Sequence, residues 1–307
     1  MNLLIVGAGA TGGFFGAHLV AAGRDVTFLV REGRASQLAR DGLVVRARKG
    51  DMTVKPKFVT AGGLNKNFDA VLVTVKAFGL EAAMQDMAPA VGPDTLVVPV
   101  LNGMKHVDDL VQRFGAARVA GGVCRVATTL DEEGRILQLA DFQELLYGEL
   151  DGSASARMDA FNALVSDAGF AAKPSRHIVQ ELWNKWIMLA GMGAACCLMR
   201  GSIGEIEASP GGLAFVNALL EEIIAIATAH GHPPAPPVVA AARGMLTAKG
   251  SPMASSMYRD MQRGLPIEAD HIVGDLLARA QAKGVATPLL AAAYTSLCVY
   301  QGRAKGA

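Results

Sequence analysis

Residues 3–22 read LLIVGAGATGGFFGAHLVAA, an apolar run that passes directly into closely spaced glycines and then into a helical pattern. A strand, a G-x-G-x-x-G turn and a helix in succession are typical of a dinucleotide-binding βαβ unit, whose helix start also favours a phosphate. The alternative, in a chain with 35 glycines, is a glycine-rich turn without a ligand. We expect the turn to bind a pyrophosphate through Gly7, Ala8, Gly9, Ala10, Thr11 and Gly12.

The end of the second predicted strand indicates which dinucleotide this would be. Residues 25–30 predict that strand, and Arg31 follows it about 20 residues after the glycines. An acidic residue at this place would hold the ribose 2′-hydroxyl of NAD, whereas arginine suits the 2′-phosphate of NADP. Arg31 therefore favours NADP, and Arg34 offers a second positive contact. The alternative is a pair of solvated arginines at the start of a surface helix.

Composition places the chain among ordinary globular proteins. Its 307 residues exceed a comfortable single core, so two domains are expected. With 51% hydrophobic residues and a net charge of +1, nothing points to nucleic acid or to a membrane surface. The longest uncharged apolar stretch, residues 186–199, is shorter than the ~18 residues of a membrane span. The four cysteines show no metal-ligand spacing, so we expect no metal and a reducing cytoplasm.

Strand and helix patterns alternate through the first half of the chain. This alternation predicts a Rossmann-type, mostly parallel, doubly wound sheet in a domain over residues 1–172. Three further strands, expected at 119–130, 135–139 and 144–150, would extend that sheet. The other elements expected here are helices at 35–40, 79–90 and 154–168 and strands at 43–47, 70–75 and 95–99.

Strand signals vanish in the second half. We expect an all-helical domain over residues 173–307, with the active site in the cleft between the two domains. One helix is expected at 210–229, with Ser209 as its N-cap. The other helices are expected at 177–199, 238–246, 253–263, 267–283 and 288–300.

Three residues are candidates for carbonyl chemistry, which needs a proton donor beside the reacting oxygen and groups that orient the substrate. Lys76 and Asn102 follow buried strands, at the edge where open α/β sheets bind ligands. Lys185 is the one basic side chain between residues 177 and 199, in apolar surroundings that suit proton delivery near neutrality. The alternatives are a simple Asn-Gly turn at 102–103 and a lysine that only reaches the surface.

Together these segments resemble the ketopantoate reductase family (2-dehydropantoate 2-reductases) over nearly the whole chain. The resemblance implies NADP as cofactor and a second domain of the kind found in 6-phosphogluconate dehydrogenase. The matching segments, besides the glycine motif and Arg31, are 75–78 (VKAF), 101–103 (LNG), 182–185 (LWNK), 255–260 (SSMYRD) and 267–270 (IEAD).

The same resemblance implies a role for each site residue. Lys185 would be the general acid and Glu268 the second catalytic residue, acting on Lys185 or on the cofactor ribose. Asn102 and Ser256 would bind the substrate. Lys76, Asn102 and Glu268 would also contact the cofactor.

The chain departs from the family pattern on the helix that carries the lysine. Family members place asparagines four and eight residues after the catalytic lysine, where this chain has Leu189 and Gly193. Both positions share the face of Lys185, so we expect them to line the substrate site, with open volume at Gly193. Residues 139–143 (LADFQ) replace a family pattern of histidine and glycine. These changes leave the expected cofactor and reaction type in place, but the identity of the substrate no longer follows from the resemblance.

The resulting hypothesis is an NADPH-dependent reductase that converts a small-molecule 2-oxoacid to a 2-hydroxyacid, without a nucleic-acid or membrane partner. Two alternatives remain open: a related dehydrogenase acting on a more apolar 2-oxoacid, and a non-catalytic NADPH-binding sensor. The sequence does not fix the oligomeric state, and a homodimer is among the assemblies it leaves open.

Overall fold

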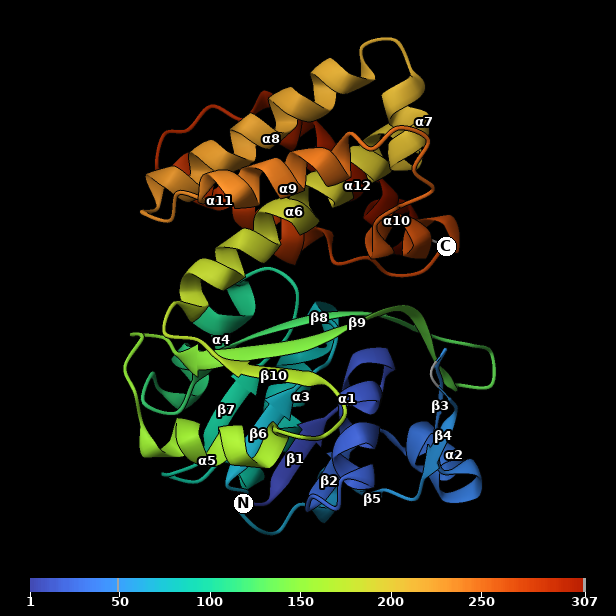
Figure 1. Cartoon of the computed structure of the whole chain (residues 1–307), viewed down its shortest axis with the longest axis vertical. Coiled ribbons are helices and arrows are strands. Elements are labelled where there is room, and N and C mark those ends of the chain that lie inside the picture. The colour runs from blue at the N-terminus through green and yellow to red at the C-terminus, as the bar shows by residue number, and fades with distance from the viewer. Residues whose placement is uncertain (49, 306–307) are drawn as a thin grey trace. The chain divides into compact units, whose positions relative to one another are not determined.

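The computed structural model describes residues 1–48 and 50–305 (Figure 1). The chain forms two compact units, an α/β unit of Met1–Leu101 with His106–Val179 and a helical unit of Asn102–Lys105 with Gln180–Ala307. The α/β unit continues past residue 172 because the N–H of Ser175 donates to the carbonyl of Tyr147, next to the last strand of that unit.

The described part of the α/β unit contains a parallel five-stranded sheet in the order β5-β2-β1-β6-β7. Its strands are β1 (Leu3–Val6), β2 (Val26–Leu29), β5 (Lys57–Val59), β6 (Ala70–Val73) and β7 (Leu96–Pro99). Every residue of β1, β6 and β7 is buried, as expected for parallel strands covered on both faces.

Alternate residues of β1 enter two separate cores, as the two-residue period of a strand requires. Leu3 and Ile5 pack in a core with Phe14, whereas Leu4 and Val6 pack in a core with Leu80. The predicted Rossmann-type, doubly wound architecture is therefore confirmed. The helices of this region are α1 (Ala10–Ala21), α2 (Glu32–Asp41), α3 (Leu80–Met87), α4 (Lys105–Phe114) and α5 (Ala156–Val165), with 3-10 turns η1 (Ala61–Gly63), η2 (Ala77–Gly79) and η3 (Ala88–Ala90).

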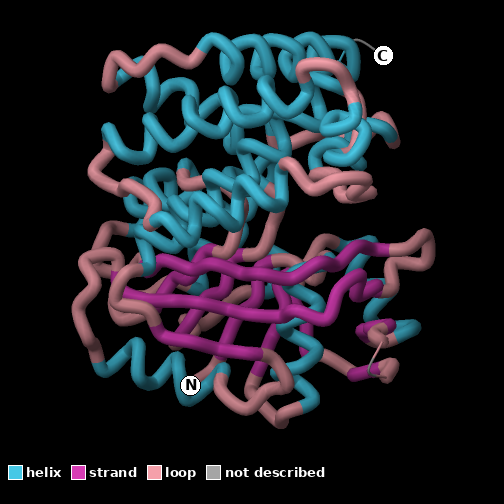
Figure 2. Tube along the Cα trace, turned by 45° about the horizontal axis from the view of Figure 1, so that its top comes forward, coloured by secondary structure: helices cyan, strands magenta, loops and turns pink. Residues whose placement is uncertain are grey.

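The strands expected to extend the central sheet form a second sheet instead, so that expectation is wrong. Its order is β10-β9-β3-β4, with β8 pairing β9, and its long strands are the extended magenta tubes in Figure 2. β8 reaches the central sheet through a bridge between Val119 and Val97. The strands are β3 (Leu43–Arg46), β4 (Met52–Val54), β8 (Ala120–Leu130), β9 (Ile136–Glu149) and β10 (Ala171–Pro174).

β9 is one strand where two were expected. Its pairing with β8 shifts between Val126 and Thr128, which oppose Gln143 and Gln138, so residues 139–142 form an irregular segment inside the strand. The amide of Gln138 donates to Gln143 over 2.9 Å and bridges this segment. The irregular segment interrupts the alternation of side chains, which explains why the sequence pattern indicated two strands.

The second unit is helical, as predicted. The expected N-cap at Ser209 is wrong, because Ser209 ends the short helix α7 and the next helix begins at Gly212. A capping box between Ser202 and Glu205 starts α7. The helices are α6 (Ile178–Met199), α7 (Ile203–Ala208), α8 (Gly212–Ala229), α9 (Pro236–Leu246), α10 (Ser256–Gln262), α11 (Asp275–Ala282), preceded by the π-helical turn η4 (Asp270–Gly274), and α12 (Pro288–Lys305).

Two of these helices, α6 and α8, are long and apolar enough to span a membrane by length and composition. The structure buries 67% of the most apolar window of α6 and 39% of that of α8 inside the protein. Gly191 of α6 lies against the side chains of Leu246 and Ile223, so the three helices α6, α8 and α9 pack together. This packing is that of core helices in a globular unit.

Candidate functional site

The glycine turn after β1 combines close packing with an open side. A Cβ atom on Gly12 would lie 2.1 Å from Oγ1 of Thr74, so glycine alone allows α1 to begin this close to β6. Gly7 has a φ of +99°, which disfavours other residues. Around the Cβ position of Gly9, by contrast, no heavy atom of the described residues lies within 4 Å. A ligand can therefore approach the backbone at Gly9.

The start of α1 suits an anion. Gly9 is the N-cap, no side chain within the described residues caps this end, and the first turn carries no acidic residue. Its N–H groups and the helix dipole favour a phosphate at this end. The hydroxyl of Thr74 lies 2.9 Å from the carbonyl of Val6 and 3.0 Å from that of Gly7, and so tethers the turn to β6. The sequence alone assigns no role to Thr74.

Arg31 lies at the entrance of α2, where it is the N-cap residue and is exposed. Its Nη2 atom is 3.9 Å from the Cβ position of Gly79 in the turn η2. Lys76, also exposed, is the N-cap of that same turn. Arg31 follows β2 and Lys76 follows β6, so both residues lie at the same edge of the parallel sheet. The contact with Gly79 places the guanidinium of Arg31 beside the segment that Lys76 begins.

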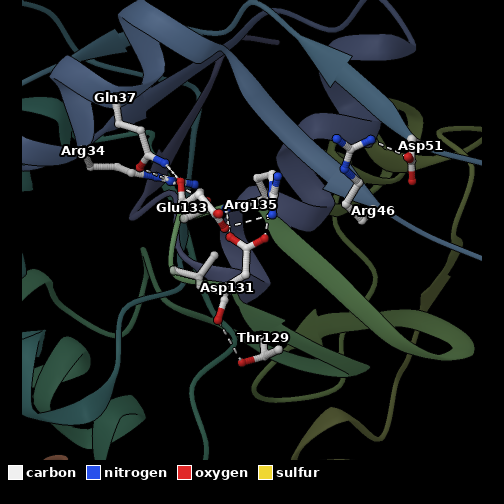
Figure 3. Close-up of polar contacts among 10 residues, drawn as sticks. Arg34, Gln37, Arg46, Asp51, Thr129, Asp131, Glu133 and Arg135 are labelled. Carbon is white, nitrogen blue, oxygen red and sulfur yellow. Dashed lines mark hydrogen bonds and ion pairs between the residues drawn. The ribbon is translucent and has the colours of Figure 1, made fainter.

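Arg34, which the sequence offers as a second positive contact for the 2′-phosphate, binds groups of the protein through two of its three guanidinium nitrogens. Its Nε–H donates to the carbonyl of Ala8 over 2.9 Å. Its Nη1 donates to the carbonyl of Gly134 over 2.7 Å. The same atom donates to Oε1 of Gln37 over 2.6 Å (Figure 3). The Nε and Nη1 atoms of Arg34 thus bind main-chain carbonyls of the glycine turn and of the turn between β8 and β9.

In the helical unit, α6 carries three of the predicted site residues at helical spacing. Lys185 and Leu189 are half-buried, and Gly193 is buried. The i, i+4, i+8 spacing places them on one face of the helix. Of the other predicted residues, Asn102 and Glu268 are half-buried and Ser256 is exposed.

Three contacts bring the segments of these residues together inside the helical unit. The indole Nε1–H of Trp186, next to Lys185, donates to the carbonyl of Ile272 over 2.8 Å. The Cβ position of Gly103, next to Asn102, is 2.4 Å from the carbonyl oxygen of His271. Both carbonyls belong to the turn η4, which follows Glu268 closely in the chain. The third contact joins α6 to the segment of Ser256.

This third contact corrects the expectation of open volume at Gly193. A Cβ atom there would lie 2.8 Å from the terminal methyl group of Met257, which is 3% exposed. The space next to Gly193 is therefore occupied by a thioether side chain. The sequence alone assigns no role to Trp186 or Met257, although Trp186 directly follows Lys185 and Met257 lies within the 255–260 segment.

The adjacent cysteines of α6, Cys196 and Cys197, are buried. All four cysteines are free thiols, and burial raises the pKa of Cys197 to about 12, so this thiol stays protonated. Among the described residues, no group of three or more His, Cys, Asp or Glu side chains is placed to hold a metal ion.

Comparisons with known proteins cover both units. A family model described as ketopantoate reductase PanE/ApbA matches residues 3–152, and the C-terminal model of that family matches residues 177–301. An uncharacterized oxidoreductase, YkpB, of Bacillus subtilis is 32% identical over 98% of this chain and 99% of its own length. A 2-dehydropantoate 2-reductase of Streptococcus pyogenes is 26% identical over 94% of this chain and 94% of its own length. A PanE/ApbA family ketopantoate reductase from Ralstonia eutropha has a TM-score of 0.90 and 25% identity, over 99% of this chain and 100% of that chain.

Proposed function

The chain belongs to the PanE/ApbA ketopantoate reductase family, and on that premise we propose that it reduces a 2-oxoacid to the 2-hydroxyacid with NADPH. The observation that carries the proposal is the glycine turn, open at Gly9 and flanked by Arg31, in a chain whose α6 bears a half-buried Lys185. The family supports the reaction type. The choice of NADPH over NADH rests on Arg31.

The residues present fit a dinucleotide phosphate. The open backbone of residues 7–12 and the uncapped start of α1 would hold the pyrophosphate. Arg31 would pair with the 2′-phosphate, and the neighbouring Lys76 would add positive charge. When bound, the cofactor supplies the hydride. We place the reaction in the cytoplasm, where the free thiols stay reduced.

The chain's own residues supply the proton and the orientation. As the carbonyl carbon accepts a hydride, its oxygen becomes an alkoxide, and Lys185 donates the proton that turns it into a hydroxyl. Asn102 and Ser256 hold the substrate through their amide and hydroxyl groups. Glu268 orients Lys185 or contacts the cofactor ribose. The balanced reaction consumes one 2-oxoacid, one hydride and one proton for each 2-hydroxyacid.

A second candidate concerns the substrate. Leu189 offers no hydrogen bond on the face of Lys185, and Met257 occupies the space beside Gly193. These apolar groups favour a 2-oxoacid with a more apolar side chain than 2-dehydropantoate, the compound in the name of the Streptococcus pyogenes relative.

A panel of 2-oxoacids tests the proposal. We would follow the loss of NADPH absorbance with 2-dehydropantoate, a branched aliphatic 2-oxoacid and an aromatic 2-oxoacid, each repeated with NADH. Turnover that is faster with NADPH supports the proposal, and the ranking of substrates decides between the two candidates. Binding of NADPH without turnover of any 2-oxoacid would favour a sensor instead. Failure to bind either nucleotide would overturn both the reductase and the sensor hypotheses.

A further inference from the structure

We propose that Arg34 is a positioning residue of the dinucleotide site, which sets the direction of the Gly9 N–H through the Ala8 carbonyl and braces the glycine turn against the turn between β8 and β9. The inference rests on the proposed function above, since it concerns binding of NADPH. It gives Arg34 a role different from that of Arg31, only three residues earlier in the chain.

The first step is the reach of the guanidinium. Arg34 is half-buried on α2 and donates to acceptors in three segments: the glycine turn through Ala8, its own helix through Gln37, and the β8–β9 turn through Gly134. The planar fork of an arginine can serve several acceptors at fixed angles, which the point charge of a lysine cannot. The guanidinium therefore holds the two turns at a fixed spacing.

The second step is the geometry of one peptide bond. None of the peptide bonds in the described residues is cis, so the C=O of Ala8 and the N–H of Gly9 point in opposite directions within one plane. Because Arg34 binds that carbonyl, the N–H of Gly9 is directed away from Arg34. Gly9 is also the residue whose surroundings are open. The amide most suited to meet a pyrophosphate is thus oriented before a ligand arrives.

The third step is the construction of the β8–β9 turn. Gly134 has a φ of +73°, and a Cβ there would lie 2.4 Å from Nε2 of Gln37 and 2.9 Å from Nη1 of Arg34. Gln37 donates its amide to the carbonyl of Glu133, beside the bond from Arg34 (Figure 3). Glycine at 134 is what lets both side chains reach the turn.

The turn is also rigid in itself. The carboxylate of Asp131 accepts from the main-chain N–H of Arg135 over 2.8 Å and from its Nε over 2.6 Å. A rigid turn is a suitable anchor for a guanidinium that must hold a second loop in place. Burial lowers the pKa of Arg34, but a guanidinium remains cationic at neutral pH, so its charge also lies behind the pyrophosphate site.

A positioning role for Arg34 and a direct contact of Arg34 with the 2′-phosphate predict different losses of nucleotide affinity. The pyrophosphate is common to NADPH and NADH, so Arg34→Met should weaken binding of both nucleotides by the same factor, about 10- to 100-fold. Arg31→Ala should weaken NADPH alone. Adenosine 2′-monophosphate carries the 2′-phosphate but no pyrophosphate, so Arg34→Met should leave its affinity unchanged.

The experiment is equilibrium binding of NADPH, NADH and adenosine 2′-monophosphate, by titration calorimetry, to the unaltered protein and to Arg34→Met, Arg34→Lys, Gln37→Leu and Arg31→Ala. Arg34→Lys, which keeps the charge without the fork, should regain only part of the loss. Gln37→Leu should cause a smaller loss, equal for both dinucleotides. Thermal melting checks that each variant is folded at the temperature of the titration.

Two results would overturn the inference. One is a loss on Arg34→Met confined to NADPH and adenosine 2′-monophosphate, which would make Arg34 a phosphate ligand. The other is unchanged affinity for both dinucleotides in folded Arg34→Met. Failure of the unaltered protein to bind either dinucleotide would contradict the proposed function itself, and so is distinguishable from these outcomes.

Discussion

The indole N–H of Trp186 donates to the main-chain carbonyl of Ile272 over 2.8 Å, from a side chain that is 1% exposed. Ile272 belongs to the π-helical turn η4, and its own N–H bonds back to the carbonyl of Glu268 over 3.0 Å. Trp186 directly follows Lys185. These two hydrogen bonds therefore tie the segment of Lys185, the proposed general acid, to the segment of Glu268, the proposed second catalytic residue.

Trp186→Phe should lower kcat by about 10- to 100-fold, because a small displacement of a catalytic group is costly while the ring still fills the core. The affinity for NADPH should stay unchanged, since the substitution lies outside the glycine turn. Steady-state kinetics and nucleotide titration check both expectations. Trp183→Phe is the matched control, as it retains an aromatic ring that can stack on His230 and His232. Equal kcat values for the two variants would contradict the positioning role.

Lys185→Ala should abolish most turnover and leave NADPH binding nearly intact, because a proton donor acts only as the alkoxide forms. General acids contribute about 10²- to 10⁴-fold, so kcat should fall within that range. Single-turnover kinetics with saturating NADPH measure the effect. Lys249→Ala, at an exposed position of the same unit, is the control for loss of charge. A loss below about tenfold would reassign the proton donor.

Arg31→Ala should weaken NADPH binding by about 10- to 150-fold and barely affect NADH. A charge-assisted bond between arginine and phosphate contributes about 1.5 to 3 kcal/mol, and NADH lacks that phosphate. Titration calorimetry with both nucleotides measures the ratio. Equal affinities of the unaltered protein for NADPH and NADH would show that Arg31 does not select the cofactor.

β5, at the edge of the central sheet, was not predicted, because Lys57–Val59 is mostly exposed. The other four strands could be predicted because they are short, mostly apolar runs next to clear turn signals. β10 could not, since Ala171–Pro174 is mostly exposed and becomes a strand by pairing with β9, which leaves no apolar periodicity. α7 is too short to show a helical period, although the spacing of Ser202 and Glu205 in the sequence is that of a capping box.

The site residues also divide into those that the local sequence predicts and those that it does not. Gly7, Gly9 and Gly12 could be assigned because their roles are set by local backbone geometry. The orientation of Arg34 could not, since a guanidinium beside a glycine turn can bind either a ligand phosphate or a main-chain carbonyl. The contact of Met257 with Gly193 joins distant parts of the chain and leaves no trace in local pattern.

Stability at acid pH should depend on Glu149, which is 6% exposed and accepts hydrogen bonds from Arg157 and Ser155. The bond from Arg157 holds the pKa of this carboxyl below its usual value of 4.5. A depressed folded-state pKa gives stability that is present above the unfolded value and is lost as pH falls through the folded one.

Glu149→Gln should therefore destabilise the α/β unit by about 1 to 3 kcal/mol near neutral pH, and the difference from the unaltered protein should shrink at a pH below 4.5 as the carboxyl is protonated. Urea denaturation at both pH values measures it. Asp41→Asn, which removes an exposed pair with Arg40, is the control and should change stability little. A difference that stays constant with pH would show that the carboxylate charge is not involved.

Substrate choice should depend on Leu189 and on the pair formed by Gly193 and Met257. Leu189→Asn restores a hydrogen-bonding group on the face of Lys185 and should raise kcat/KM for 2-dehydropantoate by about tenfold or more, since a bond to a charged or strongly polar substrate contributes about 1.5 to 3 kcal/mol. The same change should lower kcat/KM for an apolar 2-oxoacid. Gly193→Asn alone should destabilise the protein instead, because Gly193 is buried and the whole asparagine side chain would have to share space with Met257, which is 3% exposed. Combining Gly193→Asn with Met257→Ala frees that space, so stability should recover and the effect of Leu189→Asn should be reinforced. If the unaltered enzyme already turns over 2-dehydropantoate with a kcat/KM near ~10⁵ M⁻¹s⁻¹, the missing asparagines do not limit the reaction and the apolar preference is wrong.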